Sequence, residues 1–218
     1  MWTKRYLSLL LVALMALTLT ACGAALKKDK NTAMNIQPVQ LSEEEAGLME
    51  LLDIDPSAYR IFDFDVAGAQ SIRLRAYELV NGEWECVTHG AQEAANGTGR
   101  IALTFGKMTE GGRMACKDSS GVFAQEFTMK ADGTSGMAFA TSVLTDMSSI
   151  ELDQEIPLAL QVATSKSEFS TYSVDYFGMP RELAKHDYEH VYAITVTFST
   201  KAASELLDVP SAEPSPAN

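Results

Sequence analysis

Most of the chain alternates apolar and polar residues in short segments, and this period of two favours β-strands over helices. The alternation is clearest at residues 192–198, where Tyr, Ile, Val and Phe are separated by Ala and Thr. Similar segments recur between turns rich in Gly, Asn and Asp. With no β-α-β alternation, the pattern predicts an all-β fold, an antiparallel β-sandwich of about eight strands.

One hairpin is predicted in detail. Asn81 and Gly82 separate two alternating segments, and this dipeptide suits a type I′ turn, in which both central residues have positive φ. The turn sets a register that pairs residues 71–80 with 83–88. Four apolar side chains then share one face, which we expect to lie in the core: Tyr77, Leu79, Trp84 and Cys86.

Helical signals are few. Ser42 and Glu45 have the spacing of a capping box and precede several Leu and Met residues, so we expect one short N-terminal helix that is closed by Pro56. The segment 180–188 could add one or two helical turns with Pro180 at the start. We expect a further strand at residues 172–176 from its alternating Tyr and Val.

The N-terminus resembles the precursors of bacterial lipoproteins. Lys4 and Arg5 precede an apolar run at residues 6–19, and Leu19-Thr20-Ala21-Cys22 matches the lipobox. The resemblance covers only about the first tenth of the chain. It implies that residues 1–21 are a signal peptide that is removed, and that Cys22 carries a diacylglyceryl group.

The resemblance also implies a location. A lipidated Cys22 would anchor the chain to the cell membrane or the outer membrane, facing away from the cytoplasm, because each buried methylene contributes about 0.8 kcal/mol. Residues 22–40 are then the lipidated cysteine with a flexible tether, 41–205 the β-sandwich domain, and 206–218 a disordered tail rich in Pro, Ser and Ala.

The net charge of −12 argues against nucleic acid as a partner, because nucleic-acid binding needs a basic surface. The remaining cysteines, Cys86 and Cys116, form a possible disulfide in an extracytoplasmic protein, although two buried thiols that never meet are an equal alternative.

Two sets of residues are candidates for a ligand site. His186 and His190 are four residues apart, a spacing that on a helix can hold a metal, whereas in a surface loop it has no such meaning. Phe177 and Tyr188 lie in the same region and form a possible ligand surface, the alternative being that the aromatic residues there are core.

The sequence contains no nucleophile motif and implies no cofactor. We therefore expect a non-catalytic binding module for a protein, glycan or small molecule. The alternatives are an envelope hydrolase whose carboxylates converge only in the fold, and a purely structural envelope lipoprotein.

Overall fold

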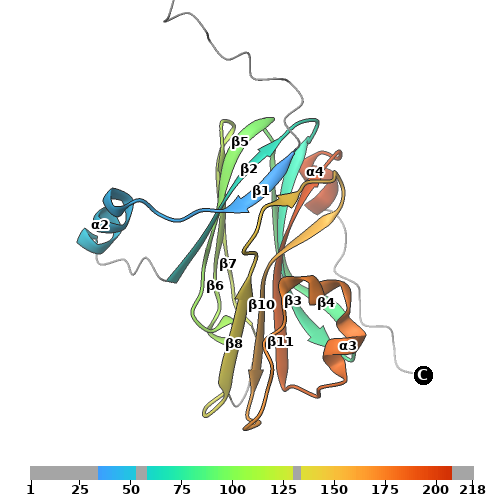
Figure 1. Cartoon of the computed structure of the whole chain (residues 1–218). Coiled ribbons are helices and arrows are strands. Elements are labelled where there is room, and N and C mark those ends of the chain that lie inside the picture. The colour runs from blue at the N-terminus through green and yellow to red at the C-terminus, as the bar shows by residue number, and fades with distance from the viewer. Residues whose placement is uncertain (1–33, 53–57, 130–133, 208–218) are drawn as a thin grey trace, which may run out of the picture. The chain divides into compact units, whose positions relative to one another are not determined.

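Two antiparallel sheets pack face to face in the computed structural model, which describes residues 34–52, 58–129 and 134–207 (Figure 1). One sheet has six strands in the order β7-β6-β5-β2-β1-β9, and the other has five in the order β4-β3-β11-β10-β8. The prediction of an all-β sandwich is confirmed, with more strands than the sequence suggested.

The six-stranded sheet consists of β1 (Asn35–Pro38), β2 (Tyr59–Val66), β5 (Gly97–Thr104), β6 (Gly112–Asp118), β7 (Gly121–Phe127) and β9 (Ser148–Ser149). The five-stranded sheet consists of β3 (Ser71–Val80), β4 (Glu83–Glu93), β8 (Ala138–Val143), β10 (Glu155–Thr164) and β11 (His190–Ser199). The helical elements are α2 (Glu43–Leu51), η2 (Met108–Glu110), η3 (Val174–Gly178), α3 (Pro180–Ala184) and α4 (Ala203–Leu207).

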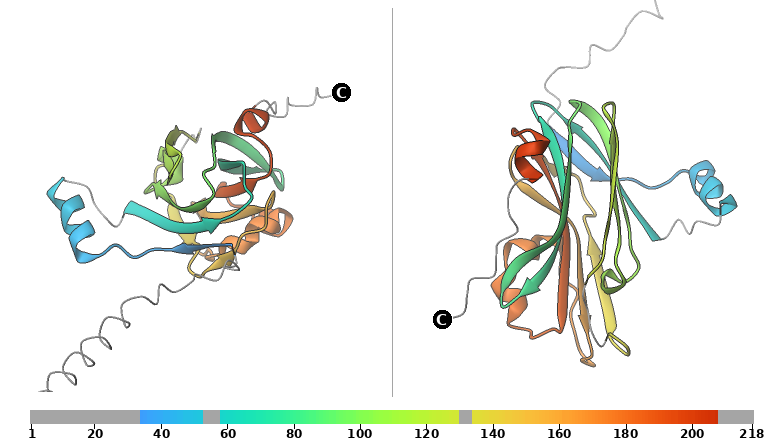
Figure 2. Two further views of the ribbon diagram at one scale, coloured as in Figure 1. Left: turned by 90° about the horizontal axis from the view of Figure 1, so that it is seen from above. Right: turned by 180° about the vertical axis from the view of Figure 1, so that it is seen from behind.

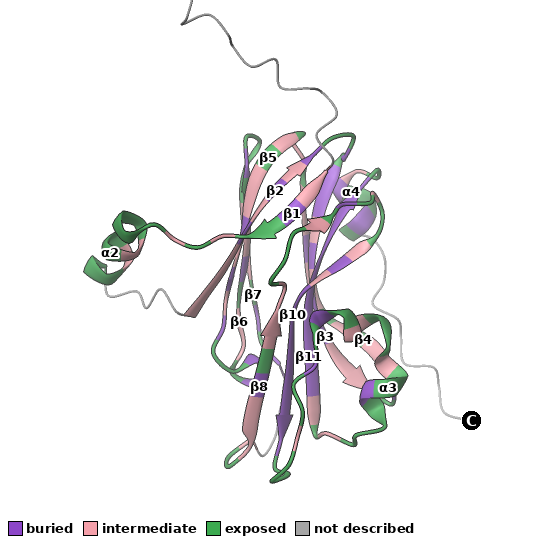
Figure 3. Cartoon of the chain, in the orientation of Figure 1, coloured by how far each residue is buried: buried purple, intermediate pink, exposed green. Residues whose placement is uncertain are grey.

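The main core lies between the two sheets. Each strand directs alternate side chains inward, so Phe64 of β2 meets Phe198 of β11 edge to face, with ring centroids 5.0 Å apart. Strands β10 and β11 are the most deeply buried elements (Figure 3). Apolar burial of this extent is the main favourable contribution to the stability of the sandwich.

The β3–β4 hairpin has the predicted turn and register. The φ angles are 52° at Asn81 and 80° at Gly82, and Leu79 lies opposite Trp84. The predicted core face of this hairpin, however, points away from the other sheet. It packs under η3 and α3 in a second apolar cluster, which includes Leu183, Leu160 and Val162. Period-two patterning identifies a buried face but not what buries it.

Helix α2 begins at the predicted cap. Ser42 Oγ accepts a hydrogen bond from the Glu45 N–H at 3.2 Å, and the Glu45 carboxylate accepts from the Ser42 N–H at 2.9 Å. None of the helix is buried, and Leu48 and Leu51 are exposed. Helix α3 has Pro180 in its first turn, as expected. No helix within the described residues is both long and apolar enough to span a membrane.

Three expectations are corrected. Residues 35–38, predicted to belong to the tether, form β1, which pairs with β2 because Ile36 enters the core. Residues 172–176 were expected to be a strand, yet η3 begins at Val174 and covers the five-stranded sheet. Residues 206 and 207, predicted to belong to the tail, are the last two residues of α4, and Leu206 is buried. Cys22, Pro56 and most of the predicted tail lie outside the described residues.

Candidate functional site

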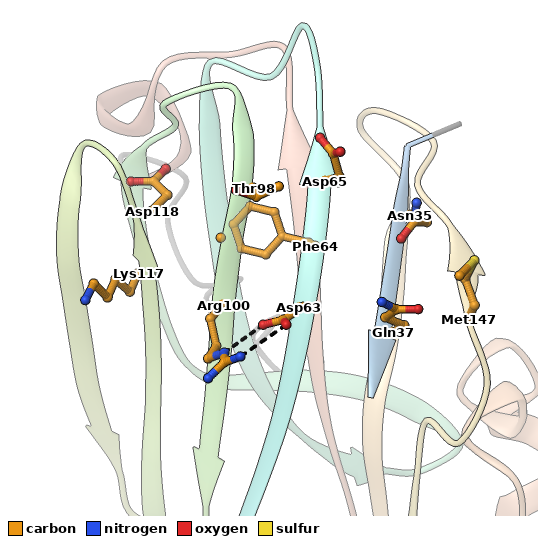
Figure 4. A pocket seen from close by; sticks show the side chains of 11 residues that line it. Asn35, Gln37, Asp63, Phe64, Asp65, Thr98, Arg100, Lys117, Asp118 and Met147 are labelled. Atoms are coloured by element: carbon orange, nitrogen blue, oxygen red, sulfur yellow. Dashed lines mark hydrogen bonds and ion pairs between the residues drawn. The ribbon is translucent and has the colours of Figure 1, made fainter. Parts of the chain in front are cut away.

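A polar hollow of about 680 Å³ lies on the outer face of the six-stranded sheet (Figure 4). Its side chains come from four neighbouring strands, β1, β2, β5 and the end of β6, and from the loop before β9. The lining residues are Asn35, Gln37, Asp63, Phe64, Asp65, Thr98, Gly99, Arg100, Lys117, Asp118 and Met147.

Strand alternation places the polar residues of this hollow. On β2, Phe62 and Phe64 are buried, so Asp63 and Asp65 project to the opposite face. The register then sets Arg100 of β5 opposite Asp63. On the other side of β2, the side chains of Asn35 and Gln37 join the same face through the pairing of β1 with β2.

An ion pair defines the floor of the hollow. Arg100 Nε donates to Asp63 Oδ1 at 2.7 Å and Nη2 donates to Oδ2 at 3.2 Å, in the two-pronged geometry that fixes a guanidinium. These bonds raise the pKa of Arg100. The third contact, from Arg100 Nη1 to the Glu45 carboxylate at 3.4 Å, ties the hollow to α2. Both members of the Asp63 pair are about 40% exposed, so they remain open to a ligand.

Beneath the floor the backbone and the core come close together. A Cβ on Gly99 would lie 2.2 Å from Cζ of Phe64 and 2.7 Å from the carbonyl oxygen of Lys117. The Phe64 ring therefore occupies the space that a side chain at residue 99 would need. Glycine at this position lets β5 lie directly over the aromatic core.

Asp118 anchors the rim of the hollow. Its carboxylate accepts hydrogen bonds from the N–H groups of Ala95 and Ser120, each at 2.8 Å, and from the Ser120 hydroxyl. Burial alone would raise the pKa of Asp118, but these hydrogen bonds outweigh it and lower the pKa. The residue thus stays ionised and holds the β6–β7 turn in place.

The two histidines of the possible metal pair do not lie on a common helix. Helix α3 ends at Ala184, so His186 and His190 do not share a helix face. His186 stacks on Tyr188, whereas His190 begins β11, stacks on Tyr192 and lies 3.1 Å from the Glu78 carboxylate. Within the described residues no group of three or more His, Cys, Asp or Glu side chains is arranged to hold a metal ion.

Of the two alternatives for the cysteines, the structure has the unbonded one, because Cys86 and Cys116 are both free thiols. Cys116 points into the core between the sheets, and burial raises its pKa to about 12. Cys86 lies opposite Tyr77 on the outer face of the five-stranded sheet. The thiols are therefore on opposite sides of that sheet, a placement that a disulfide cannot bridge.

Phe177 and Tyr188 belong to the packing over the five-stranded sheet. Phe177 stacks on Trp84 at 5.1 Å, and its carbonyl oxygen accepts a hydrogen bond from the Trp84 indole at 2.8 Å. The Tyr188 hydroxyl lies 2.9 Å from that of Tyr172. Burial, together with this hydrogen bond, raises the pKa of Tyr172 to about 12. The alternative reading of these aromatics as packing residues matches this arrangement.

The residues that line the hollow are not among those predicted to form a site. In the sequence, Asp63 and Asp65 alternate with apolar residues, but nothing there brings Arg100, Gln37 or Lys117 to them. Local signals were present, because residues 98 and 100 alternate like residues 63 and 65. What the sequence lacks is the pairing of β2 with β5, whose strands are separated by an intervening hairpin.

Comparison with known proteins gives no relative: no family model, curated protein or solved structure matches this chain.

Proposed function

We propose that this chain is a lipid-anchored extracytoplasmic binding protein, attached through Cys22 to the cell membrane or the outer membrane, whose ligand site is the hollow on the six-stranded sheet. The observation that carries the proposal is the open arrangement of polar side chains over β1, β2 and β5. Concave sites with a few convergent polar groups are where proteins most often bind ligands.

The lining suits a ligand rich in hydroxyl and amide groups. Gln37 offers an amide that both donates and accepts, Asp63 accepts, and Arg100 and Lys117 donate. These groups stand side by side on a sheet whose strands are about 4.8 Å apart, a spacing that lets one extended ligand reach several of them. An oligosaccharide of the cell envelope has this chemistry and is the ligand class we propose.

The hollow supports binding better than hydrolysis. A hydrolase with two carboxyl groups needs one of them protonated near neutral pH, which requires a raised pKa. In the hollow, the hydrogen bonds to Asp118 lower its pKa, and Asp63 is paired with Arg100. The ionised Asp118 carboxylate accepts hydrogen bonds but donates no proton, and both oxygens of Asp63 are engaged by Arg100.

The binding proposal is tested with the full chain, purified in detergent and applied to immobilised oligosaccharides that include N-acetylglucosamine oligomers. We expect retention on at least one glycan and a loss of about tenfold in Gln37→Ala, since one lost hydrogen bond to a ligand is worth about 1–1.5 kcal/mol. Gln154→Ala is the matched control, because Gln154 is exposed and lies outside the hollow. Equal losses in both variants, or retention on no glycan, would reject the ligand class.

Lipidation of Cys22 is tested separately. Bacteria that express the chain are grown in medium that contains radiolabelled palmitate. Lipidation of Cys22 predicts label in the parent chain and none in Cys22→Ser, together with release of the variant from the membrane fraction. Cys86→Ser is the control that keeps the label. Label that persists in Cys22→Ser would contradict the anchor and leave the binding proposal standing.

A further inference from the structure

The outer face of the five-stranded sheet carries a polar stretch between two covered ends. Helix α4 covers one end and buries Leu206, and η3 with α3 covers the other (Figure 2, right). Cross-strand pairing sets Arg75 opposite Thr195 and Arg73 opposite Thr197. The outward-facing residues of the stretch are Arg73, Arg75, Tyr77, Glu155, Thr195 and Thr197.

The positive charge of one guanidinium in this stretch, that of Arg75, is paired with a carboxylate. Arg75 Nη1 donates to the Tyr77 hydroxyl at 2.7 Å, and that hydroxyl donates to Glu155 Oε1 at 2.7 Å. The same carboxylate oxygen accepts from the Thr195 hydroxyl at 2.6 Å and lies 3.5 Å from Arg75 Nη1. Glu155 is thus the counter-ion of Arg75.

The second guanidinium, that of Arg73, forms no ion pair with a described residue, and Glu155 acts on it only at longer range. Arg73 Nε is buried and makes no hydrogen bond, and the same holds for the hydroxyl of Thr197, which is 4% exposed on the adjacent strand. Burial lowers the pKa of Arg73, and the positive charge of Arg75 lowers it further, with a larger effect than the opposing one of Glu155. Arg73 and Arg75 are thus two neighbouring cations with one carboxylate, that of Glu155, beside them.

We infer that Arg73 and Thr197, with Arg75 beside them, form a binding site for an oxyanion, the carboxylate or phosphate group of a small ligand. A guanidinium matches such a group with two parallel N–H donors, and a neighbouring hydroxyl adds a third. The bound charge would balance Arg73 and give partners to two buried polar atoms. This site lies on a different sheet from the hollow and does not depend on the function proposed for it.

The test is thermal unfolding of the full chain in detergent, followed by circular dichroism, in sodium phosphate or sodium acetate against sodium chloride at the same pH and ionic strength. An anion that binds only the folded state raises the midpoint. We expect a saturable rise of roughly 3–6 °C when the anion is at about ten times its Kd. The salt that gives the larger rise identifies phosphate or carboxylate as the preferred group.

Variants distinguish anion binding at this site from the general stabilising effect of such salts, which does not saturate. Arg73→Gln should abolish the saturable rise, and Thr197→Val, which keeps the side-chain shape, should reduce it. Arg113→Gln makes the same charge change on the exposed face of β6 and should leave the rise intact. A rise that is absent from the parent chain, or equal in the parent and in both site variants, would overturn the inference.

Discussion

The outer faces of the two sheets have the same alternation of side chains but differ in what lies over them. Helical elements cover parts of the five-stranded sheet, and the six-stranded sheet carries the open hollow. On the five-stranded sheet, outward residues near η3 and α3, such as Trp84 and Leu160, are apolar, and these two elements cover them. On the six-stranded sheet, outward residues such as Asp63 and Arg100 are charged and line the hollow. The composition of the outward positions therefore decides which parts of a face are closed by packing and which stay open to solvent.

Chain connectivity explains the difference. The segment between β10 and β11 contains η3 and α3, and the segment after β11 contains α4. Both segments start from the five-stranded sheet and return across it, where Leu183 becomes fully buried. Helix α2, by contrast, reaches the six-stranded sheet through an ion pair of Glu45 with Arg100 and keeps Leu48 exposed. One face thus has helices held by apolar burial, and the other a helix held by charge.

The largest expected change in unfolding free energy distinguishes attachment by apolar burial from attachment by charge. Leu183→Ala should lower the free energy of unfolding by about 2–5 kcal/mol, because it leaves a cavity under α3. Leu48→Ala, the same change on α2, should alter it by no more than about 0.5 kcal/mol. Urea unfolding monitored by circular dichroism measures both. Similar losses in the two variants would mean that α2 is packed as tightly as α3.

A second pair of variants tests the closeness of β5 to the core beneath the hollow. Gly99→Ala should cost about 1–3 kcal/mol of unfolding free energy, since the new Cβ would overlap Phe64 and the backbone oxygen of Lys117. Gly47→Ala has open space around it and should stabilise α2 by about 0.5–1 kcal/mol. If chemical denaturation finds Gly99→Ala neutral, β5 must lie farther from Phe64 than the structure places it.

Lowering the pH should reduce the contribution of Asp118 to the free energy of unfolding, over a pH range that its pKa sets. The pKa of Asp118 is lower in the folded chain than in the unfolded chain. Its contribution to stability is therefore present above the unfolded value of about 3.9 and is lost as pH falls through the lower folded value. Asp118→Asn should cost about 1–2 kcal/mol at pH 7 and little at the lowest pH. A pH-independent difference in unfolding free energy would contradict this assignment.

The ion pair in the hollow should matter little for folding. Arg100→Gln should change the free energy of unfolding by only about 0–1 kcal/mol, because the Asp63 pair is exposed to water. The same variant should lose glycan retention, and this contrast distinguishes a ligand contact from a packing residue. A variant that unfolds readily would place Arg100 among the structural residues instead.

The smallest expected effect concerns the thiols. A reducing agent should leave the unfolding midpoint unchanged, because Cys86 and Cys116 are not bonded to each other. Cys116 should react with a thiol reagent only after denaturation, since it is buried and its pKa is raised to about 12. Mass spectrometry of the alkylated chain, with and without denaturant, counts the reactive thiols.

Local features of the fold follow from the sequence because neighbouring residues determine them. The Ser42 cap, the Asn81-Gly82 turn and the hairpin register depend on contacts within a few residues, and all three predictions are confirmed. The order of the strands does not follow, because β1 pairs with β2 and β9 through contacts between distant segments. For the same reason the lining of the hollow is visible only in the fold.

The two histidines show how spacing misleads without the surrounding structure. His186 and His190 are four residues apart, but a turn separates them and β11 directs His190 inward to Glu78. The spacing carries metal-binding information only on a continuous helix. The same holds for Cys86 and Cys116, whose separation along the chain says nothing about which face of a sheet each occupies.

Chemical-shift mapping tests most directly which face binds. The full chain, labelled with ¹⁵N in detergent micelles, would be titrated with the oligosaccharide that it retains most strongly. The contrast between the two faces predicts that shifts concentrate at Gln37, Asp63 and Arg100, on β1, β2 and β5, with Trp84 and Phe177 unchanged. Shifts concentrated at Trp84 and Phe177 would contradict the account and place the ligand on the five-stranded sheet.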